Sequence, residues 1–272
     1  MENYYSLKYI LKILKKNTIS ISLITSLTGI ISAYYLYKTP DIYLSSSLVT
    51  ISGQNNSINR TSSLIQSFTG SSMSSSPDVI TNDIVIATAK SRQFVLTFIQ
   101  NYDLVSALFP KLSDLSKPKQ YEIYDKFLNN HLSIVENQAN GYLTFNIRHE
   151  SPKIAYEVLS NYIEELDSYF RQYKKNKATE ALSFYENESR NTSNKNLLSS
   201  LVNLIEQNYQ TLSFTNMSER YALIEIDPPN LPEMKIYPNR TMLTILYTFL
   251  SFLAAVVFTT IYGIYKDEKI ED

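Results

Sequence analysis

The feature that most constrains this chain is an apolar stretch near its carboxyl end, residues 241–265. It contains no Asp, Glu, Lys, Arg or His, so nothing charged would be placed in lipid. Twenty-five residues of helix extend roughly 37 Å, and the hydrocarbon core of a bilayer is about 30 Å thick. Tyr237, Tyr262 and Tyr265 lie where interfacial aromatic residues are expected. The stretch therefore predicts a membrane-spanning helix with most of the chain on one side.

The segment that leads into this stretch, residues 227–240, is rich in proline. Proline fixes φ and keeps the preceding residue out of the helical region. We therefore predict a stiff, extended strap that sets the height of the preceding domain above the bilayer. The prolines that define it are Pro228, Pro229, Pro232 and Pro238.

A second uncharged stretch, residues 19–37, lies near the amino end and reaches roughly 28 Å as a helix. A cleaved signal peptide is the alternative, but Ser32-Ala33-Tyr34 followed by further tyrosines is a poor cleavage site. We expect an uncleaved anchor.

The distribution of lysines predicts the orientation of the two spans, because basic residues stay on the cytoplasmic side. Only Lys38 closely follows the first span, whereas the preceding tail, residues 1–18, is basic. Both this tail and residues 266–272 are then cytoplasmic, and residues 38–240 face the periplasm or the cell surface. The lysines that set this topology are Lys8, Lys12, Lys15 and Lys16.

Composition excludes several classes of function. The net charge is -1, so no basic field is present to hold nucleic acid. Cysteine is absent, which excludes disulfides, cysteine metal sites and a thiol nucleophile. Glycine occurs five times, too few for a glycine-rich phosphate loop, so we expect no cofactor.

Between the spans, the pattern predicts an α+β domain with a small mixed sheet at its base. Asn140-Gly141 favours a hairpin turn between two of the strands. A segment rich in Ser, Asn and Thr, residues 53–76, is either a flexible surface loop or an ordered loop that lines a cavity or touches glycan. Strands are expected at residues 43–52, 132–135, 142–147 and 222–226, and helices at 79–99, 104–110 and 121–128.

A long helix is predicted after Ser151-Pro152, which supplies an N-cap and a first-turn proline. Apolar residues at spacings of three and four form a stripe along this helix, and the same pattern resumes at residues 197–212. The pattern indicates one helix, or two in series, that would reach up to roughly 90 Å. The stripe packs either within the chain or against neighbouring copies, and we favour the second. Its residues are Ala155, Val158, Tyr162, Leu166, Tyr169 and Tyr173.

No catalytic or metal site can be assembled from the sequence. His131 and His149 flank the predicted hairpin without a partner motif, so we interpret them as structural. Glu164, Glu165 and Asp167 are interpreted as the solvated helix face opposite the stripe. A membrane-anchored hydrolase would need converging groups, and a sensor would need cytoplasmic machinery beyond the final seven residues.

The chain resembles the polysaccharide chain-length determinant family, the Wzz-type polysaccharide co-polymerases. The resemblance covers essentially the whole chain. It is carried by residues 227–232 and 238–240 before the second span, and by residues 217–222. Further matches lie at residues 89–92 with 108–110, and at 143–148 with 151–152.

The resemblance implies a bacterial inner-membrane protein with both tails in the cytoplasm and a periplasmic domain topped by a long helix. It also implies homo-oligomers that work with a membrane-embedded polymerase on a lipid-linked glycan such as lipopolysaccharide O-antigen, without catalysis of their own. Capsule or exopolysaccharide export is the alternative role, although residues 266–272 after the second span contain no phosphate loop and no tyrosine-rich tail, as the kinase-bearing relatives would have. Two departures stand out. The second span has Gly263 near its end but lacks the small-residue, glycine-spaced face that many members show, and the domain is short for the family.

Overall fold

The computed structural model describes residues 7–52, 80–110, 119–217 and 220–271. The chain forms two compact units, one made of residues 1–42 with 234–272 and the other of residues 43–233. The polar segment predicted as a loop, residues 53–76, lies outside the described residues.

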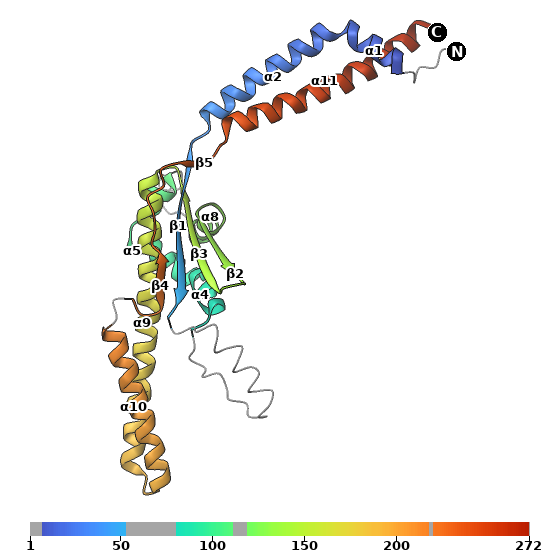
Figure 1. The fold of residues 1–272 in the computed structure, drawn as a ribbon. Helices are drawn as coiled ribbons and strands as arrows, with labels where there is room; N and C mark the ends of the chain where they lie inside the picture. Colours follow the sequence, from blue (N-terminus) through green and yellow to red (C-terminus); the bar gives the residue numbers. More distant parts are fainter. Residues whose placement is uncertain (1–6, 53–79, 111–118, 218–219, 272) are drawn as a thin grey trace. The chain divides into compact units, whose positions relative to one another are not determined.

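The larger unit is built on a sheet in the order β2-β3-β1-β4 (Figure 1). Every pairing along this order is antiparallel, which corrects the expected mixed sheet. The reason is that the β2–β3 hairpin places β3 between β1 and β2, the two strands that share a direction. This order is that of a split β-α-β arrangement. The strands are β1 (Ile42–Ile51), β2 (Leu132–Asn137), β3 (Tyr142–His149) and β4 (Leu223–Asp227).

Alternation along the strands gives the sheet one apolar face. In β1 the side chains of Val49 and Ile51 are buried, and in β3 those of Leu143, Phe145 and Ile147 are buried. The hairpin turn forms as predicted, because Gly141 adopts φ 70°, in the left-handed region that glycine favours.

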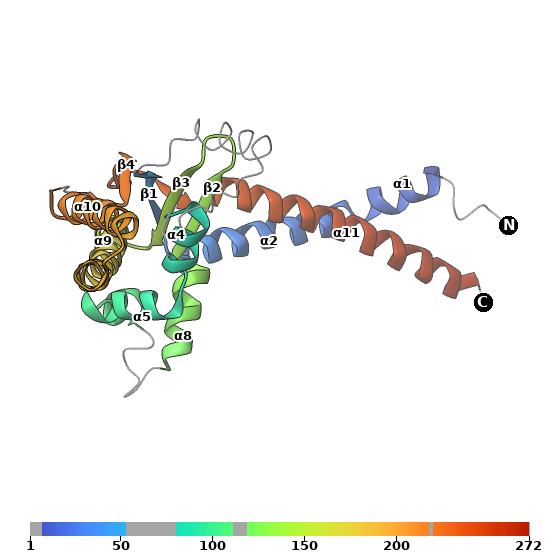
Figure 2. The ribbon, with the colours of Figure 1, turned by 90° about the horizontal axis from the view of Figure 1, so that it is seen from below.

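The chain segment that connects β1 to β2 forms a group of short helices, and these helices cover the apolar face of the sheet. Thr81 and Ser91 cap the first two, their hydroxyls accepting from the amides of Ile84 and Phe94. Figure 2 shows α5 on the same side of the strands as the long helix α9 (Pro152–Asn191). These helices are α4 (Asn82–Ala89), α5 (Arg92–Asn101), α6 (Val105–Leu108), α8 (Gln120–Lys126) and the π-helix η1 (Phe127–His131).

The core centres on Tyr162 of α9, which is fully buried. Its ring meets Phe94 and Phe98 edge-on, at centroid distances of 5.4 and 4.9 Å. Its hydroxyl donates to the carbonyl of Ala89, and burial raises its pKa above the ordinary value. The aromatic cluster therefore joins α9 to α4 and α5.

The predicted long helix is two helices that form a hairpin, α9 and α10 (Lys195–Met217), as Figure 1 shows. The chain turns at residues 192–194, where Thr192 leaves the helical region at φ -95° and ψ 135°. Asn194 then starts α10, because its side-chain oxygen accepts from the amides of Asn196 and Leu197. A single helix of up to about 60 residues is therefore wrong: the polar run 191–196 reverses the chain.

The smaller unit contains two long apolar helices, α2 (Thr18–Lys38) and α11 (Arg240–Glu271). Helix α1 (Leu7–Lys16) precedes α2 and carries the four topology lysines named above. A short strand, β5 (Lys235–Tyr237), lies ahead of α11. The helices begin and end within a few residues of the stretches predicted to span a membrane, apart from the longer carboxyl end of α11.

Candidate functional site

The two apolar helices are the first candidate functional element. Thr18–Lys38 and Arg240–Tyr265 have mean hydropathies of 1.6 and 2.1 and are long enough to cross a bilayer. Only 11% and 6% of their most apolar windows are buried. A core helix of a water-soluble protein would be mostly buried, so their apolar surface needs another environment.

Small side chains lie at the contact between α2 and α11. The hydroxyls of Thr28 and Ser251 lie 2.7 Å apart and share a hydrogen bond across the two helices. A Cβ added at Gly29 would lie 3.2 Å from Oγ1 of Thr248, so the backbone approaches closely there. Small residues at such contacts are typical of helix packing in membranes.

The contact side of α11 is therefore a stripe of small residues, although glycine spacing alone did not reveal it. Ala255 and Thr259 are buried, and a Cβ added at Gly263 would lie 2.6 Å from Cγ2 of Ile13 in α1. The sequence led us to expect that this span lacks a small-residue, glycine-spaced face. The glycine spacing is indeed missing, but Ala, Ser and Thr supply small residues on the contact side. The stripe consists of Thr248, Ser251, Ala255, Thr259 and Gly263, at spacings of three and four residues.

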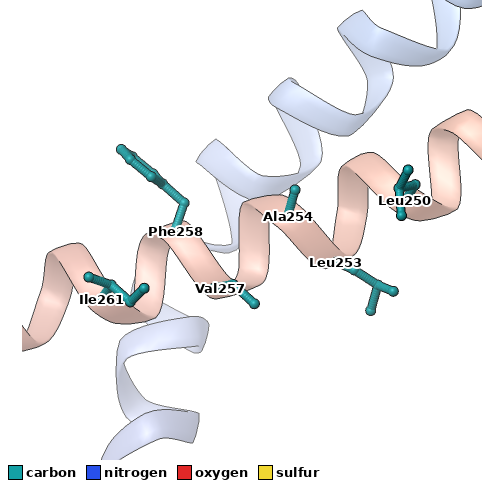
Figure 3. Close-up of a pocket in the computed structure, with 6 residues that line it drawn as sticks. All are labelled: Leu250, Leu253, Ala254, Val257, Phe258 and Ile261. Carbon is teal, nitrogen blue, oxygen red and sulfur yellow. The ribbon is translucent and has the colours of Figure 1, made fainter.

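The opposite character marks the outer side of α11, where large apolar side chains are exposed. Five of them, together with Ala254, line a shallow groove in which every drawn side-chain atom is carbon (Figure 3). Ala254 is the one small residue among the six that line it. The lining residues are Leu250, Leu253, Ala254, Val257, Phe258 and Ile261.

Charged side chains join the end of α2 to the start of α11. One carboxylate oxygen of Asp41 accepts from Lys235 Nζ and from Arg240 Nη2, each at 2.9 Å. Arg240 also donates to the carbonyls of Leu36 and Thr39, which are exposed by the end of α2. This cluster fixes the two helix ends side by side.

The proline-rich strap is held at its beginning by serines of β1. Ser47 donates to the carbonyl of Asp227 at 2.9 Å, and Ser45 donates to that of Asn230 at 2.8 Å. Pro228, Pro229 and Pro232 lie in or beside this stretch without regular structure. Pro238 is buried just before α11.

The stripe predicted on α9 divides into two parts. Ala155, Val158, Tyr162 and Leu166 are buried in the core of their own chain, so they are not available to neighbouring copies. This corrects the preferred interpretation of these four, because the sheet and α5 supply the surface they pack against. Tyr169 and Tyr173 remain 47% and 44% exposed.

The helical hairpin is the second candidate functional element. Its two arms are joined by a hydrogen bond from Tyr209 Oη to Glu186 Oε1 at 2.9 Å. Large apolar side chains nevertheless stay exposed along it, which is typical of a surface that contacts another protein. These residues are Tyr169, Tyr173, Phe184, Val202, Tyr209 and Phe214.

The acidic residues of α9 differ from one another in environment. Glu164 is exposed, and Glu165 accepts from Asn101 at 3.2 Å. Asp167, expected on the solvated face, is 2% exposed and accepts from the amides of Tyr221, Ala222 and Leu223. It therefore fixes the start of β4 to α9. The sequence carried no signal for this, because the partners lie more than 50 residues away.

The histidines and carboxylates that the structure describes were the candidates for a metal site. Within the part of the chain that the structure describes, no group of three or more His, Cys, Asp or Glu side chains is arranged to hold a metal ion. His131 and His149, placed at two separate strand ends by the sequence, instead lie against each other, with ring centroids 5.9 Å apart.

Comparison with known families adds to this geometry. Residues 4–102 match the family model described as Wzz, chain length determinant protein. This part of the chain is similar to the Wzz chain length determinant family. The resemblance predicted from the sequence is thereby confirmed. No curated protein matches the Wzz-like chain.

Three solved structures are similar to the Wzz-like chain, each with a TM-score below 0.5. A full-length bacterial polysaccharide co-polymerase has 14% identity and a TM-score of 0.47, with 96% of this chain and 99% of that chain covered. A fragment of the co-polymerase WzzB from Salmonella Typhimurium has 15% identity and a TM-score of 0.33, covering 73% and 100%. The A107P mutant of the Shigella flexneri O-antigen chain-length regulator WzzBSF has 14% identity and a TM-score of 0.26, covering 72% and 100%.

Proposed function

We propose that this protein regulates the chain length of a surface polysaccharide as a membrane-anchored scaffold without catalytic activity of its own. The observation that carries the proposal is the match of residues 4–102 to the chain length determinant model. The glycan we propose is lipopolysaccharide O-antigen or a related polymer. The working partner is a membrane-embedded polymerase that acts on lipid-linked glycan.

The membrane anchor in this proposal is the pair α2 and α11, which spans the inner membrane of a bacterium. Small residues lie at its contact, and most of its large apolar residues face outward, as is expected where the solvent is lipid. The termini are cytoplasmic, since Lys15 and Lys16 precede α2, and residues 38–240 are periplasmic.

The scaffold in this proposal is a homo-oligomer formed through the helical hairpin. The supporting observation is the exposed aromatic surface of α9 and α10, where Phe184 is 62% and Phe214 is 64% exposed. Of the predicted stripe, Tyr169 and Tyr173 belong to this surface. A ring of copies would gather polymerase molecules, and the geometry of that ring would set the glycan length.

Gel analysis of surface polysaccharide from cells with and without the gene tests the function. We expect a clustered ladder to collapse to a random, short-weighted distribution when the gene is removed. Complete loss of polymer would indicate capsule or exopolysaccharide export instead, and an unchanged ladder would favour a two-span sensor.

A pair of charge substitutions tests the scaffold. Tyr173→Glu with Phe184→Glu should reduce the oligomer to smaller species, measured by light scattering of the detergent-solubilised full chain, and should shorten the glycan. Lys175→Glu, a similarly exposed change on the same helix, is the matched control and should do neither. An intact oligomer in the double variant would refute the hairpin as the contact surface.

A further inference from the structure

The two histidines of this chain, His131 and His149, are in contact. The chain has only two, and they are 18 residues apart. His131 ends the π-helix η1 and His149 ends β3, yet their rings stack with centroids 5.9 Å apart and an interplanar angle of 28°. Phe109 packs edge-on against His131 at 5.3 Å. The contact thus joins three segments: the end of α6, η1 and the end of β3.

Both nitrogens of His149 have backbone partners. Its Nδ1 accepts from the amide of Ser151 at 2.9 Å, so this nitrogen carries no proton. Its Nε2 lies 3.2 Å from the carbonyl of Ala107, to which it can donate. This arrangement requires the neutral ring. Ser151 is the N-cap of α9, and its own side chain makes no capping bond, so His149 supplies a polar contact at the start of a 40-residue helix.

Protonation would disturb this contact in three ways. A proton on Nδ1 of His149 would remove its bond to Ser151 and place a hydrogen against that amide. Two charged rings stacked at 5.9 Å would repel each other. A positive charge beside the amino end of α9 would also oppose the helix dipole.

The surroundings of His131 also favour the neutral ring. Burial lowers the pKa of His131, and the charge of His149 lowers it further. The carbonyls of Arg148 and Leu108 act in the opposite direction by accepting hydrogen bonds, as does the negative charge of Glu150. The net effect is a pKa below the ordinary value of about 6.5.

We propose that the His131–His149 pair is an acid-sensitive junction, which holds the end of α6 and the end of β3 against the start of α9 at neutral pH and loosens in acid. A group whose pKa is lowered by folding adds stability above its unfolded pKa, and this stability is lost as the pH falls through the folded pKa. The loss therefore begins below about pH 6.5.

The composition allows a pH response near pH 6 to be assigned to the two histidines. Histidine is the only side chain whose unperturbed pKa lies between about 5 and 8, and cysteine, the usual exception when perturbed, is absent. Any response of side chains in this pH range that follows histidine titration must therefore come from this pair.

Hydrogen exchange of the full chain in detergent, at pH 7.5 and 5.5 and corrected for intrinsic rates, tests the junction. We expect peptides covering residues 104–110 and 149–157 to lose protection at pH 5.5, by up to about tenfold from the lowered pKa of His131. Peptides at the hairpin turn, residues 186–198, contain no histidine and should keep their protection. Equal protection at both pH values for the junction peptides would overturn the proposal.

A double variant, His131→Asn with His149→Asn, separates titration from packing. The Asn oxygen at 149 can accept from Ser151, the Asn amide at 131 can donate to Arg148, and neither titrates. We expect the variant to lose the pH dependence of the junction peptides. A variant that folds and keeps the dependence would refute the role of the pair.

If the double variant fails to fold, the exchange of the histidine ring C2 protons in the wild-type chain decides. A titration midpoint for His131 below about 6.5 supports the junction, and a midpoint at or above that value refutes it.

Discussion

The helix pair α2/α11 and the sheet domain differ in where most of their large apolar side chains lie. In the domain many of these side chains are buried, such as Phe145 and Leu166. In the helix pair Leu36 is buried, as are Ala255 and Thr259, but most large apolar side chains are exposed, such as Leu250 and Phe258 at 60% and 67%. Because the hydrophobic effect buries large apolar groups only where water is the alternative, the two regions are suited to different solvents.

This difference separates an anchor from a core more sharply than hydropathy does. A buried helix of a soluble protein and a membrane span have similar composition, but the span leaves most of its large apolar side chains exposed and packs against its neighbour through small and hydroxyl-bearing residues. The Thr28–Ser251 hydrogen bond fits this rule, since a hydroxyl in lipid needs a partner within the protein.

We expect the largest loss of stability at Asp167, a charged side chain that is buried in a domain whose core is otherwise mainly apolar. Asp167→Ala removes one acceptor shared by three backbone amides and by Arg171, and it should lower the free energy of unfolding by about 3–5 kcal/mol. Urea unfolding of the full chain in detergent, followed by tyrosine fluorescence, measures this. Glu164→Ala, an exposed neighbour, should change stability by less than about 0.5 kcal/mol. Equal effects at both positions would contradict the role of Asp167 as the link to β4.

A pair of identical substitutions compares the two regions directly. Leu166→Ala opens a cavity in the core and should cost about 2–5 kcal/mol of unfolding free energy, measured as above. Leu253→Ala on the outer side of α11 creates no cavity, and its effect should stay within about 0.5 kcal/mol. A large loss at Leu253 would show that its side chain is covered by another helix and would break the comparison.

The smallest effect is expected inside the helix pair. Thr28→Val removes the interhelical hydrogen bond, which is worth about 0.6 kcal/mol in such a setting. With Gly29→Cys and Thr248→Cys as reporters in this cysteine-free chain, the disulfide equilibrium should shift by about threefold. Thr260→Val is the control, because that hydroxyl bonds to the Val256 carbonyl of its own helix. Shifts of the same size in both variants would indicate that the interhelical bond contributes nothing.

Local sequence patterns predicted most elements of the fold. The uncharged stretches correspond to α2 and α11, the alternating segment to β1, and Asn140-Gly141 to the hairpin turn. These features depend on interactions between residues close in sequence, where propensity and periodicity carry the information.

The errors concern contacts between distant residues. The stripe on α9 was correctly identified as apolar, but periodicity cannot tell whether a neighbouring copy or the chain's own sheet covers it. Asp167 resembles any exposed helical carboxylate until β4 returns to it. The meeting of His131 with His149 depends on where η1 and β3 end in space. The sequence therefore predicted which residues are apolar, acidic or basic, but it did not predict which residues they contact.

The length of the α9–α10 hairpin, and so the distance that it extends from the sheet, can change without changing the sheet. Because β1 pairs with β4, with Leu48 opposite Asp227, the chain leaves and re-enters the sheet at fixed places whatever lies between. Inserting or deleting matched turns in the two arms near residues 192–194 would change the projection by about 1.5 Å per residue in each arm and leave the sheet unaltered. Evolution could thus alter the reach of this arm by short insertions and deletions alone, without redesigning the domain that carries it.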